Sequence, residues 1–380
     1  MSLISSSQLN SAKRLLFISP LALGDFLYIK TFLAAFKAQQ PHIEVDIWLD
    51  DNRNNKDAWR LSRSQIMQQW ITAEPAFTRC YGCCDSNDSL QAQITQAKAL
   101  DYDLIITHSG SKSEQFSDIA RQISPNGFIV SSIGKSKLMG LFDAYFFRGS
   151  DKVFKLDTDR LPANDHITDR YYQLLNSITG LTLDKADFMP SLAIPDEIKM
   201  ITQNWLKAKF SVPERQGRVV FLNHLSTNSK RDWQQQQLFQ LIEKIGQNTP
   251  DIRFIINVTG ENLNEMEKSV LESSSLSPFQ VAVFTVNEHF FELPSIIAQS
   301  DVVITVETAI MHFATASQRP LIAMMRQKKP YWAPPINDRT QVLYATQGKG
   351  HVSDICVGEV ERTYKKMLNS IENTDSVSIK

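Results

Sequence analysis

The stretch LLFISPLALGDFLYIKTF, residues 15–32, passes from a strand-like apolar run to a helix-like pattern through a Gly-Asp pair. Leu15–Ile18 is a short, continuous apolar run, which is typical of a strand buried in a parallel sheet. From Phe26 onward, apolar residues recur at helical spacing. Gly24 and Asp25 lie at the turn between the two. Asp25 is therefore either a helix cap or a carboxylate placed for chemistry at the end of a strand.

The alternation of strand-like runs and helical patterns continues along both halves of the chain. The first half contains runs at Val45–Leu49, Leu104–Thr107 and Phe128–Ser131, with helical patterns at Phe26–Ala38 and Ser113–Gln122. The second half contains runs at Val219–Leu222, Phe254–Val258, Val281–Phe284, Val302–Val306 and Leu321–Met324, and a helical pattern at Trp233–Ile245. This order predicts an α/β protein with two parallel sheets, each covered by helices on both faces.

A less regular middle separates the halves and predicts two domains. It contains a helical pattern at His166–Thr179 and the segment MPSLAIPDE, residues 189–197, whose prolines favour an extended linker. We expect a first Rossmann-like domain over residues 1–188 and a second over 189–350. A C-terminal helix and tail should follow over 351–380, and packing back on the first domain is one arrangement open to it. In such sheets ligands bind beyond the carboxyl ends of the strands, so the residues that follow the strands are the candidates.

Composition excludes several classes of protein. Hydrophobic residues make up 42% and charged residues 21% of the 380-residue chain, which is ordinary for a soluble globular protein. The net charge of −1 gives no global attraction to nucleic acid or to an anionic membrane. No signal peptide is evident, and we expect a cytoplasmic protein, free or loosely held at a membrane surface.

Two short patterns suggest metal or redox chemistry only weakly. The segment Cys80-Tyr-Gly-Cys83-Cys84 contains a CxxC spacing, but a second ligand pair at zinc-site distance is missing from the sequence. Reduced structural cysteines and a redox or metal role both remain open. Two Asp-x-Asp patterns, Asp101/Asp103 and Asp157/Asp159, match the metal-binding pattern of some glycosyltransferases, but such short patterns often arise by chance. We expect no metal site, and the sequence contains neither a GxGxxG fingerprint nor a P-loop.

Two loops in the second half are candidate anion sites. Thr308 can cap the helix that follows Val302–Val306, and the open N–H groups there can bind a diphosphate. In the same segment Glu307 can accept from sugar hydroxyls and His312 lies about one turn into the helix. A capped helix with a half-buried histidine is the plainer interpretation. The second loop, NHLSTNSKRDW at 223–233, offers hydroxyls, two cations and Asp232 as a helix cap, or is simply a polar loop.

Several segments, in order, resemble glycosyltransferase family 9, the lipopolysaccharide heptosyltransferases, which are inverting enzymes of the GT-B fold. These segments are LLFISPLALGDFLYIKTFLAAFKAQQP, YDLIITHSGSKS, FIVSSIGKSK, HITDRYYQLL, VVFLNHLSTNSKRDW and DVVITVETAIMHFATASQRPLIAM. The resemblance spans roughly residues 14–326, and the order of the motifs is more specific than any one of them. It implies two Rossmann-like domains that face a central cleft.

The resemblance implies a role for each candidate residue. Asp25 would be the general base that takes a proton from the acceptor hydroxyl. The donor would be a nucleotide sugar, most simply ADP-heptose, with no metal or further cofactor. Its binding residues would be Ser226, Thr227, Lys230, Glu261, Glu307, Thr308, Ala309 and His312. Lys230 would neutralise the diphosphate, and Glu261 would take the ribose.

The acceptor implied by the resemblance is a lipopolysaccharide or lipooligosaccharide core, which carries carboxylates and phosphates. Cations that follow strands of the first half are weak candidates for binding it: Arg60, Arg63, Lys135 and Lys137. Solvated surface cations are the plainer interpretation of each. Arg326, Lys328 and Lys329 form a second candidate patch. The glycolipid acceptor would allow at most peripheral contact with the inner membrane.

This sequence departs from the family pattern near the donor. Glu307-Thr308-Ala309 replaces the usual Asp-Thr-Gly, Met311 replaces a Ser, and RQKKP at 326–330 replaces a Tyr-Gly-Pro-like turn. These differences leave two alternatives open. One is a family-like transferase with another nucleotide-sugar donor or a surface-polysaccharide acceptor. The other is a nucleotide-sugar-binding homologue that has lost catalysis.

Overall fold

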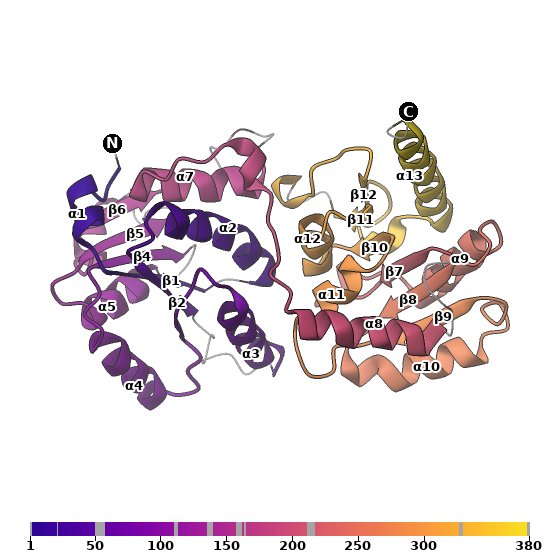
Figure 1. The fold of residues 1–380 in the computed structure, drawn as a ribbon, viewed down its shortest axis with the longest axis horizontal. Helices are drawn as coiled ribbons and strands as arrows, with labels where there is room; N and C mark the ends of the chain where they lie inside the picture. The colour runs from indigo at the N-terminus through magenta and orange to yellow at the C-terminus, as the bar shows by residue number, and fades with distance from the viewer. Residues whose placement is uncertain are drawn as a thin grey trace. The chain divides into compact units, whose positions relative to one another are not determined.

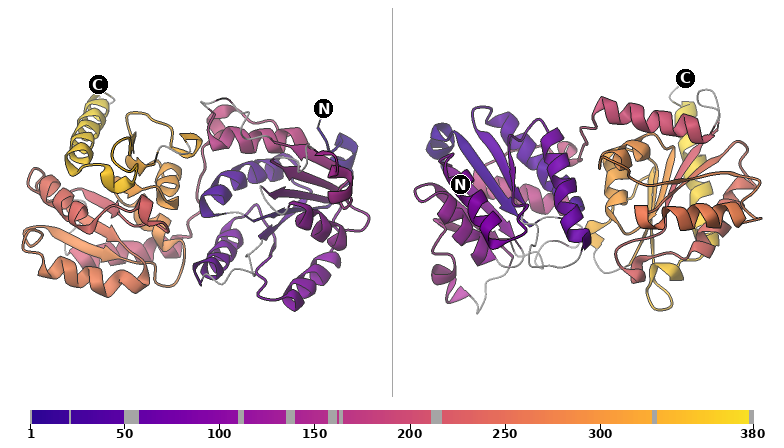
Figure 2. Two further views of the ribbon diagram at one scale, coloured as in Figure 1. Left: turned by 180° about the vertical axis from the view of Figure 1, so that it is seen from behind. Right: turned by 90° about the horizontal axis from the view of Figure 1, so that it is seen from below.

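The computed structural model describes residues 2–20, 22–49, 58–109, 113–134, 140–156, 162, 165–210, 217–326 and 330–377. Contacts divide the chain into two compact units, Met1–Pro190 and Ser191–Lys380. Each unit is a layered α/β structure with helices on both faces of one sheet (Figures 1 and 2). The two Rossmann-like folds predicted from the alternation of strands and helices are therefore confirmed.

The first unit is built on a six-stranded parallel sheet in the order β3-β2-β1-β4-β5-β6. Its strands are β1 (Arg14–Ser19), β2 (Glu44–Leu49), β3 (Cys80–Tyr81), β4 (Leu104–Ser109), β5 (Phe128–Ile133) and β6 (Lys152–Lys155). Its helices are α1 (Ser6–Ser11), α2 (Leu23–Gln39), α3 (Ala58–Ala73), α4 (Asn87–Lys98), α5 (Ser113–Ile123), α6 (Asp143–Phe146) and α7 (Ile167–Thr179). The strand order reverses between β1 and β4, which is where ligands bind in such sheets.

The second unit repeats this topology in the order β12-β11-β10-β7-β8-β9. Its strands are β7 (Val219–Asn223), β8 (Arg253–Asn257), β9 (Gln280–Phe284), β10 (Val302–Val306), β11 (Leu321–Met325) and β12 (Thr340–Tyr344). Its helices are α8 (Asp196–Phe210), α9 (Gln235–Gly246), α10 (Leu263–Glu272), α11 (Glu292–Ala298), α12 (Ala309–Ala316) and α13 (Val357–Val377). Here the order reverses between β7 and β10.

The last helix, α13, packs in the core of the second unit. Val360, Tyr364 and Met367 are buried with the apolar side chains of α9 and of the central strands. The expected contact of the segment after residue 350 with the first domain stays a prediction. None of the helices in the described ranges combines the length and apolar character that crossing a bilayer requires.

Three edge strands are absent from the predicted runs, whereas the edge strand β9 coincides with the predicted run Val281–Phe284. β3 and β6 lie at the two edges of the first sheet, and β12 lies at one edge of the second. The side chains of β6 are exposed or half-buried, so this strand lacks the continuous apolar run of a central strand. The central strands β1, β7 and β10 are almost wholly buried and coincide with the predicted runs.

A buried ion pair joins α2 to Glu74, the residue that follows α3 in the first unit. The Lys30 Nζ lies 2.8 Å from the Glu74 Oε1, and the side chains are 5% and 8% exposed. The Trp70 Nε1 donates to the same carboxylate oxygen at 2.9 Å. The ring of Phe26 meets the edge of Trp70, with centroids 5.1 Å apart. This contact fixes α2, the helix that carries Asp25, against its neighbour.

Removing one member of this pair should destabilise the first unit strongly, because a buried charge is then left unpaired. We expect Glu74→Leu to lower the free energy of unfolding of this unit by about 3–5 kcal/mol. Adding Lys30→Met to that variant should recover most of the loss, since no buried charge then remains. Urea denaturation of the variants measures both effects, with Lys185→Ala, which removes the exposed partner of Asp169 in the same unit, as the control. A double variant no more stable than the single variant would contradict this account.

Candidate functional site

The first candidate group lies where β1 and β4 end, at the switch point of the first sheet. Asp25 is in the first turn of α2, where the positive end of the helix dipole favours a carboxylate. The N-cap of this helix is Ala22, which makes no side-chain cap bond, so the interpretation of Asp25 as the cap is wrong. Its Oδ1 instead accepts a hydrogen bond of 2.6 Å from the Tyr171 hydroxyl.

Tyr171, on α7, lies in a polar cluster that the sequence analysis did not identify. The ring of His108, on β4, meets Tyr171 edge to face, with centroids 5.9 Å apart. The His108 Nδ1 lies 3.2 Å from the Ser132 Oγ on the neighbouring strand β5. Burial lowers the pKa of His108 to about 4, so the ring is neutral at pH 7. The helical pattern at His166–Thr179 and the motif HITDRYYQLL marked α7 in the sequence, but neither singled out the tyrosine.

The second candidate group lies where β7 and β10 end, at the switch point of the second sheet. Thr308 is the N-cap of α12, and its side chain accepts from the Ile310 N–H at 3.3 Å, as predicted. Ala309 is the first residue of this helix, so its backbone N–H lies at the helix start. His312 is in the same first turn but is buried rather than half-buried, with its ring centroid 5.8 Å from that of Trp332.

A chain of buried and half-buried polar side chains supports the start of α12. The Asn257 Nδ2 donates to the Asn223 Oδ1 at 3.0 Å, and the Asn223 Nδ2 donates to the Thr305 Oγ1 at 3.1 Å. The Thr305 Oγ1 lies 3.4 Å from the Thr308 Oγ1. The chain therefore runs from β8 through β7 and β10 to the cap of α12. The available signal was polar residues within the predicted strands, Asn257 and Thr305, and directly after one, Asn223.

Glu307 is held between two basic residues. Its Oε1 lies 3.6 Å from the Arg231 Nε, and its Oε2 accepts from the Arg326 backbone N–H at 3.1 Å. The Arg326 side chain in turn donates to the Gly350 carbonyl at 2.9 Å. Arg231, which received no role from the sequence, is thereby placed at the start of α12. Glu307 therefore orients protein groups, whereas its expected contact with the donor sugar stays a prediction.

The loop after β7 is folded on its own side chains. The Asp232 Oδ1 accepts from both the N–H and the hydroxyl of Ser226, at 2.6 and 2.8 Å. The cap predicted for Asp232 is wrong, because α9 begins at Gln235 with Gln234 as its N-cap. The remaining predicted donor residues of this edge, Thr227, Lys230 and Glu261, are exposed.

Several other candidate residues fall outside the donor and base groups. Lys135, Lys137, Lys328, Lys329, Asp157 and Asp159 lie outside the described residues, as do the side chains of Arg60 and Arg63. Asp103 lies at the opposite edge of the first sheet, where it accepts from the Lys13 and Arg14 N–H groups at 2.6 and 3.0 Å. The described residues contain no group of three His, Cys, Asp or Glu side chains arranged for a metal ion.

The four cysteines are reduced, and Cys84 is buried in the core of the first unit. Burial, followed by the neighbouring Cys83, raises the pKa of the Cys80 thiol well above its usual value. A protonated thiol is a poor nucleophile, so this environment favours the structural interpretation of the CxxC segment.

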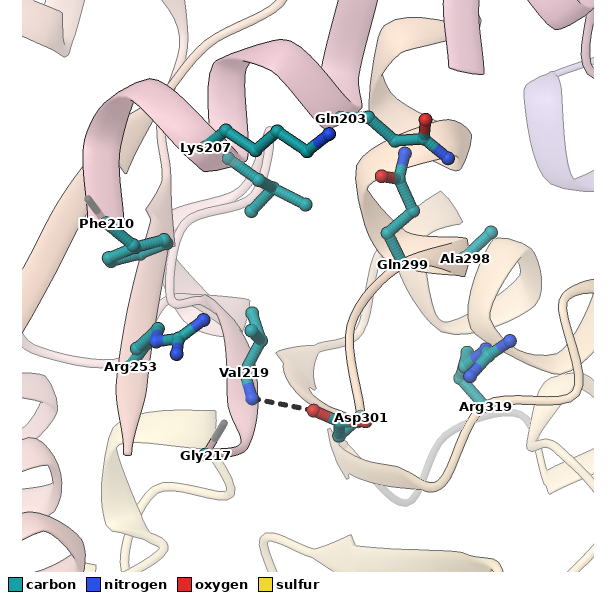
Figure 3. A pocket seen from close by; sticks show the side chains of 11 residues that line it. Gln203, Lys207, Phe210, Gly217, Val219, Arg253, Ala298, Gln299, Asp301 and Arg319 are labelled. Carbon is teal, nitrogen blue, oxygen red and sulfur yellow. Dashed lines mark hydrogen bonds between the residues drawn. The ribbon is translucent and has the colours of Figure 1, made fainter. Parts of the chain in front are cut away.

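A pocket of about 700 Å³ lies on the side of the second sheet where its strands begin. Figure 3 shows Lys207, Arg253 and Arg319 around it, and the Asp301 side chain accepts from the Val219 N–H at 2.8 Å. Val219 and Arg253 are the first residues of β7 and β8. The pocket is therefore at the amino ends of the strands, away from the edge where such sheets bind ligands.

Comparisons with known proteins agree with this architecture. The family model described as glycosyltransferase family 9 (heptosyltransferase) matches residues 127–357. No curated protein sequence matches the chain.

Solved structures are similar to the chain over nearly its whole length. A glycosyl transferase family 9 protein from Veillonella parvula is 17% identical, with a TM-score of 0.73, and the match covers 94% of this chain and 97% of that one. E. coli ADP-heptose LPS heptosyltransferase II is 14% identical, with a TM-score of 0.69 and coverages of 94% and 99%. E. coli heptosyltransferase WaaC with ADP-2-deoxy-2-fluoro heptose is 15% identical, with a TM-score of 0.62 and coverages of 93% and 99%. At these identities the likeness shows the fold.

The buried His224, which follows β7, should make the second unit sensitive to acid. Burial lowers its pKa from 6.5 to about 4. Between these pH values the unfolded chain binds a proton that the folded chain does not, so stability falls as the pH falls. We expect the loss to approach roughly 3 kcal/mol at pH 4. His224→Gln should flatten the decline in the free energy of unfolding between pH 7 and 5, measured by urea denaturation. An equally steep decline in that variant would contradict the assignment.

Proposed function

The chain belongs to glycosyltransferase family 9, with the GT-B architecture of two Rossmann-like folds, and on that basis we propose that it transfers heptose from ADP-heptose to a lipopolysaccharide or lipooligosaccharide core. The observation that carries the proposal is the built helix start at β10–α12. Thr308 caps it, and Arg231 is held beside it by Glu307. A helix N-terminus next to a cation is suited to a diphosphate. Solved relatives carry ADP-heptose or its fluoro analogue in their descriptions.

On this proposal the donor diphosphate lies at the N–H groups of Thr308 and Ala309. Lys230 and Arg231 neutralise its charge, and Thr227 donates a hydroxyl hydrogen bond. Ser226 orders the loop through Asp232, so its contribution to the donor is indirect. Glu261 remains the proposed partner of the ribose, and His312 that of a sugar or phosphate group. These donors stabilise the negative charge that develops on the leaving nucleotide, so the scheme needs no metal ion or further cofactor.

Asp25 is the proposed general base for attack by the acceptor. Its carboxylate takes the proton of an acceptor hydroxyl as that oxygen bonds to the anomeric carbon of the donor sugar. The bond from the anomeric carbon to the diphosphate breaks, the nucleotide leaves as an anion, and the configuration inverts. The dipole of α2 and the hydrogen bond from Tyr171 both favour the ionised carboxylate that this step requires.

The proposed acceptor carries phosphates and carboxylates, so we assign its recognition to cations of the first unit. Arg60 and Arg63 lie on α3, and Lys135 and Lys137 follow β5 in the sequence. The proposed site of action is the cytoplasmic side of the inner membrane, with at most peripheral contact and no nucleic-acid partner.

A second candidate is a transferase of the same family with a different donor sugar or a surface-polysaccharide acceptor. Glu307, Ala309 and Met311 favour it, because they replace family residues at the proposed diphosphate site. A thermal-shift screen of nucleotide sugars separates the two, since a ligand that binds only the folded protein raises the melting temperature. Hydrolysis or transfer of a donor above background that Asp25→Asn abolishes would exclude the remaining alternative, a homologue that binds a donor without transferring it.

Replacing the proposed base should remove catalysis and spare donor binding. We expect Asp25→Asn to lower the turnover of ADP-heptose with a lipooligosaccharide acceptor at least about 100-fold, because the amide cannot take the proton. The affinity for ADP, measured by calorimetry, should stay within about twofold of the wild-type value, because Asp25 is assigned no donor contact. Near-normal turnover in Asp25→Asn would exclude the base role.

Replacing either cation of the loop after β7 should weaken binding of the nucleotide. We expect Arg231→Ala to raise the Kd for ADP about tenfold and Lys230→Ala to raise it as well, because each loses a charge-assisted contact with phosphate. Arg218→Ala, at the start of β7 on the opposite edge, serves as the matched control. Unchanged affinity for ADP in both loop variants would place the diphosphate elsewhere.

A further inference from the structure

We propose that Tyr171 is the positioning residue of the reaction, which holds the Asp25 carboxylate ionised and in one orientation through its hydroxyl. The inference rests on the proposed role of Asp25 as the general base. It adds a second residue, 146 positions away in the sequence, on a different helix.

The geometry of the contact favours a fixed hydrogen bond. The Tyr171 side chain is 4% exposed, and its hydroxyl lies 2.6 Å from the Asp25 Oδ1. Few rotamers are open to a buried ring, so the hydroxyl stays where α7 places it. A hydroxyl that donates to a carboxylate stabilises the charged form and restricts rotation of the carboxyl group.

The surroundings keep Tyr171 a hydrogen-bond donor. Burial and then the charge of Asp25 raise the pKa of Tyr171 well above its usual value, so the hydroxyl keeps its proton at physiological pH. The groups that face it are Asp25 and Tyr28 from α2, Arg170 from α7 and His108 from β4. His108 is neutral at pH 7 because burial lowers its pKa to about 4. Asp25 and Arg170 are thus the charged groups among those that face Tyr171, and Asp25 is the one that accepts its hydrogen bond.

The helix that carries Tyr171 is itself anchored to α2. His166 is the N-cap of α7, and its ring lies edge to face with Tyr28 on α2, with centroids 5.2 Å apart. The His166 N–H donates to the Asp169 Oδ2 at 2.9 Å, which completes the cap. The start of α7 is thus held against α2 by the His166–Tyr28 contact in addition to the Tyr171–Asp25 hydrogen bond, which favours a fixed distance between the hydroxyl and the carboxylate.

The test compares two adjacent tyrosines of the same helix. Tyr171→Phe keeps the ring beside His108 and removes only the hydroxyl. Tyr172→Phe is the matched control, because the Tyr172 ring packs on Phe188 with centroids 4.7 Å apart, away from the carboxylate. Circular dichroism confirms that both variants are folded.

The first measurement uses no substrate. The Asp25 carboxyl is followed by NMR of protein labelled with ¹³C at the aspartate carboxyl groups, and its signal is identified by its loss in Asp25→Asn. We expect Tyr171→Phe to raise the pKa of this carboxyl by about one unit, because one hydrogen bond to the anion is lost. Tyr172→Phe should leave it unchanged. Equal titration in the wild type and in Tyr171→Phe overturns the inference.

The second measurement uses ADP-heptose and a lipooligosaccharide acceptor. We expect Tyr171→Phe to lower kcat roughly tenfold, with the KM for ADP-heptose within about twofold, and to move the acidic limb of the kcat profile to higher pH. A residue that only stabilises the fold would not move this limb. If Tyr171→Phe changes the pKa of the Asp25 carboxyl but the wild-type protein transfers no heptose, the positioning contact is supported. The proposed donor or acceptor is then wrong instead. If Asp25→Asn abolishes transfer but kcat is the same in Tyr171→Phe and Tyr172→Phe, the inference is overturned.

Discussion

Parallel pairing of the strands is the constraint on which both candidate sites depend. Because every strand of a sheet runs the same way, all the segments that leave the carboxyl ends emerge at one edge. The strand order reverses once in each sheet, between β1 and β4 and between β7 and β10, and the helices on either side of that point diverge. Asp25 and His108 lie at the first reversal, and the loop after β7 and the start of α12 lie at the second. Side chains from distant parts of the sequence are thereby brought close together without a long loop.

The central strands of each sheet could be predicted from the sequence, for a physical reason. β1, β7 and β10 are buried on both faces and therefore read as continuous apolar runs. The side chains of the edge strand β6 are exposed or half-buried, so its sequence is not a continuous apolar run. The cap at Thr308 was predictable because its hydroxyl acts on a backbone N–H only two residues away. The capping rule was misleading at Asp25 and Asp232. Their carboxylates accept hydrogen bonds from Tyr171 and Ser226, which are further away in the sequence than a cap's partner.

The residues that the sequence did not reveal are those defined by tertiary contacts. Tyr171 is one of two adjacent tyrosines, and only the fold decides which of them meets Asp25. Arg231 is one of two adjacent cations, and only its approach to Glu307 places it at the start of α12. The Asn223–Thr305 contact likewise depends on the register between β7 and β10. In each case the chemical type was visible in the sequence, but its partner was not.

Glu307 also limits how this part of the chain can evolve. Its two oxygens face Arg231 and the backbone of Arg326, which lie on either side of the strand tip. An aspartate there, as in the family pattern, would withdraw the carboxylate by about 1.5 Å, the length of one bond. The contact with Arg231, already 3.6 Å long, would then be lost unless the backbone moved as well. A return to aspartate is therefore tolerable only together with a change at position 231 or a shift of the backbone, so positions 231 and 307 should vary together across homologous sequences.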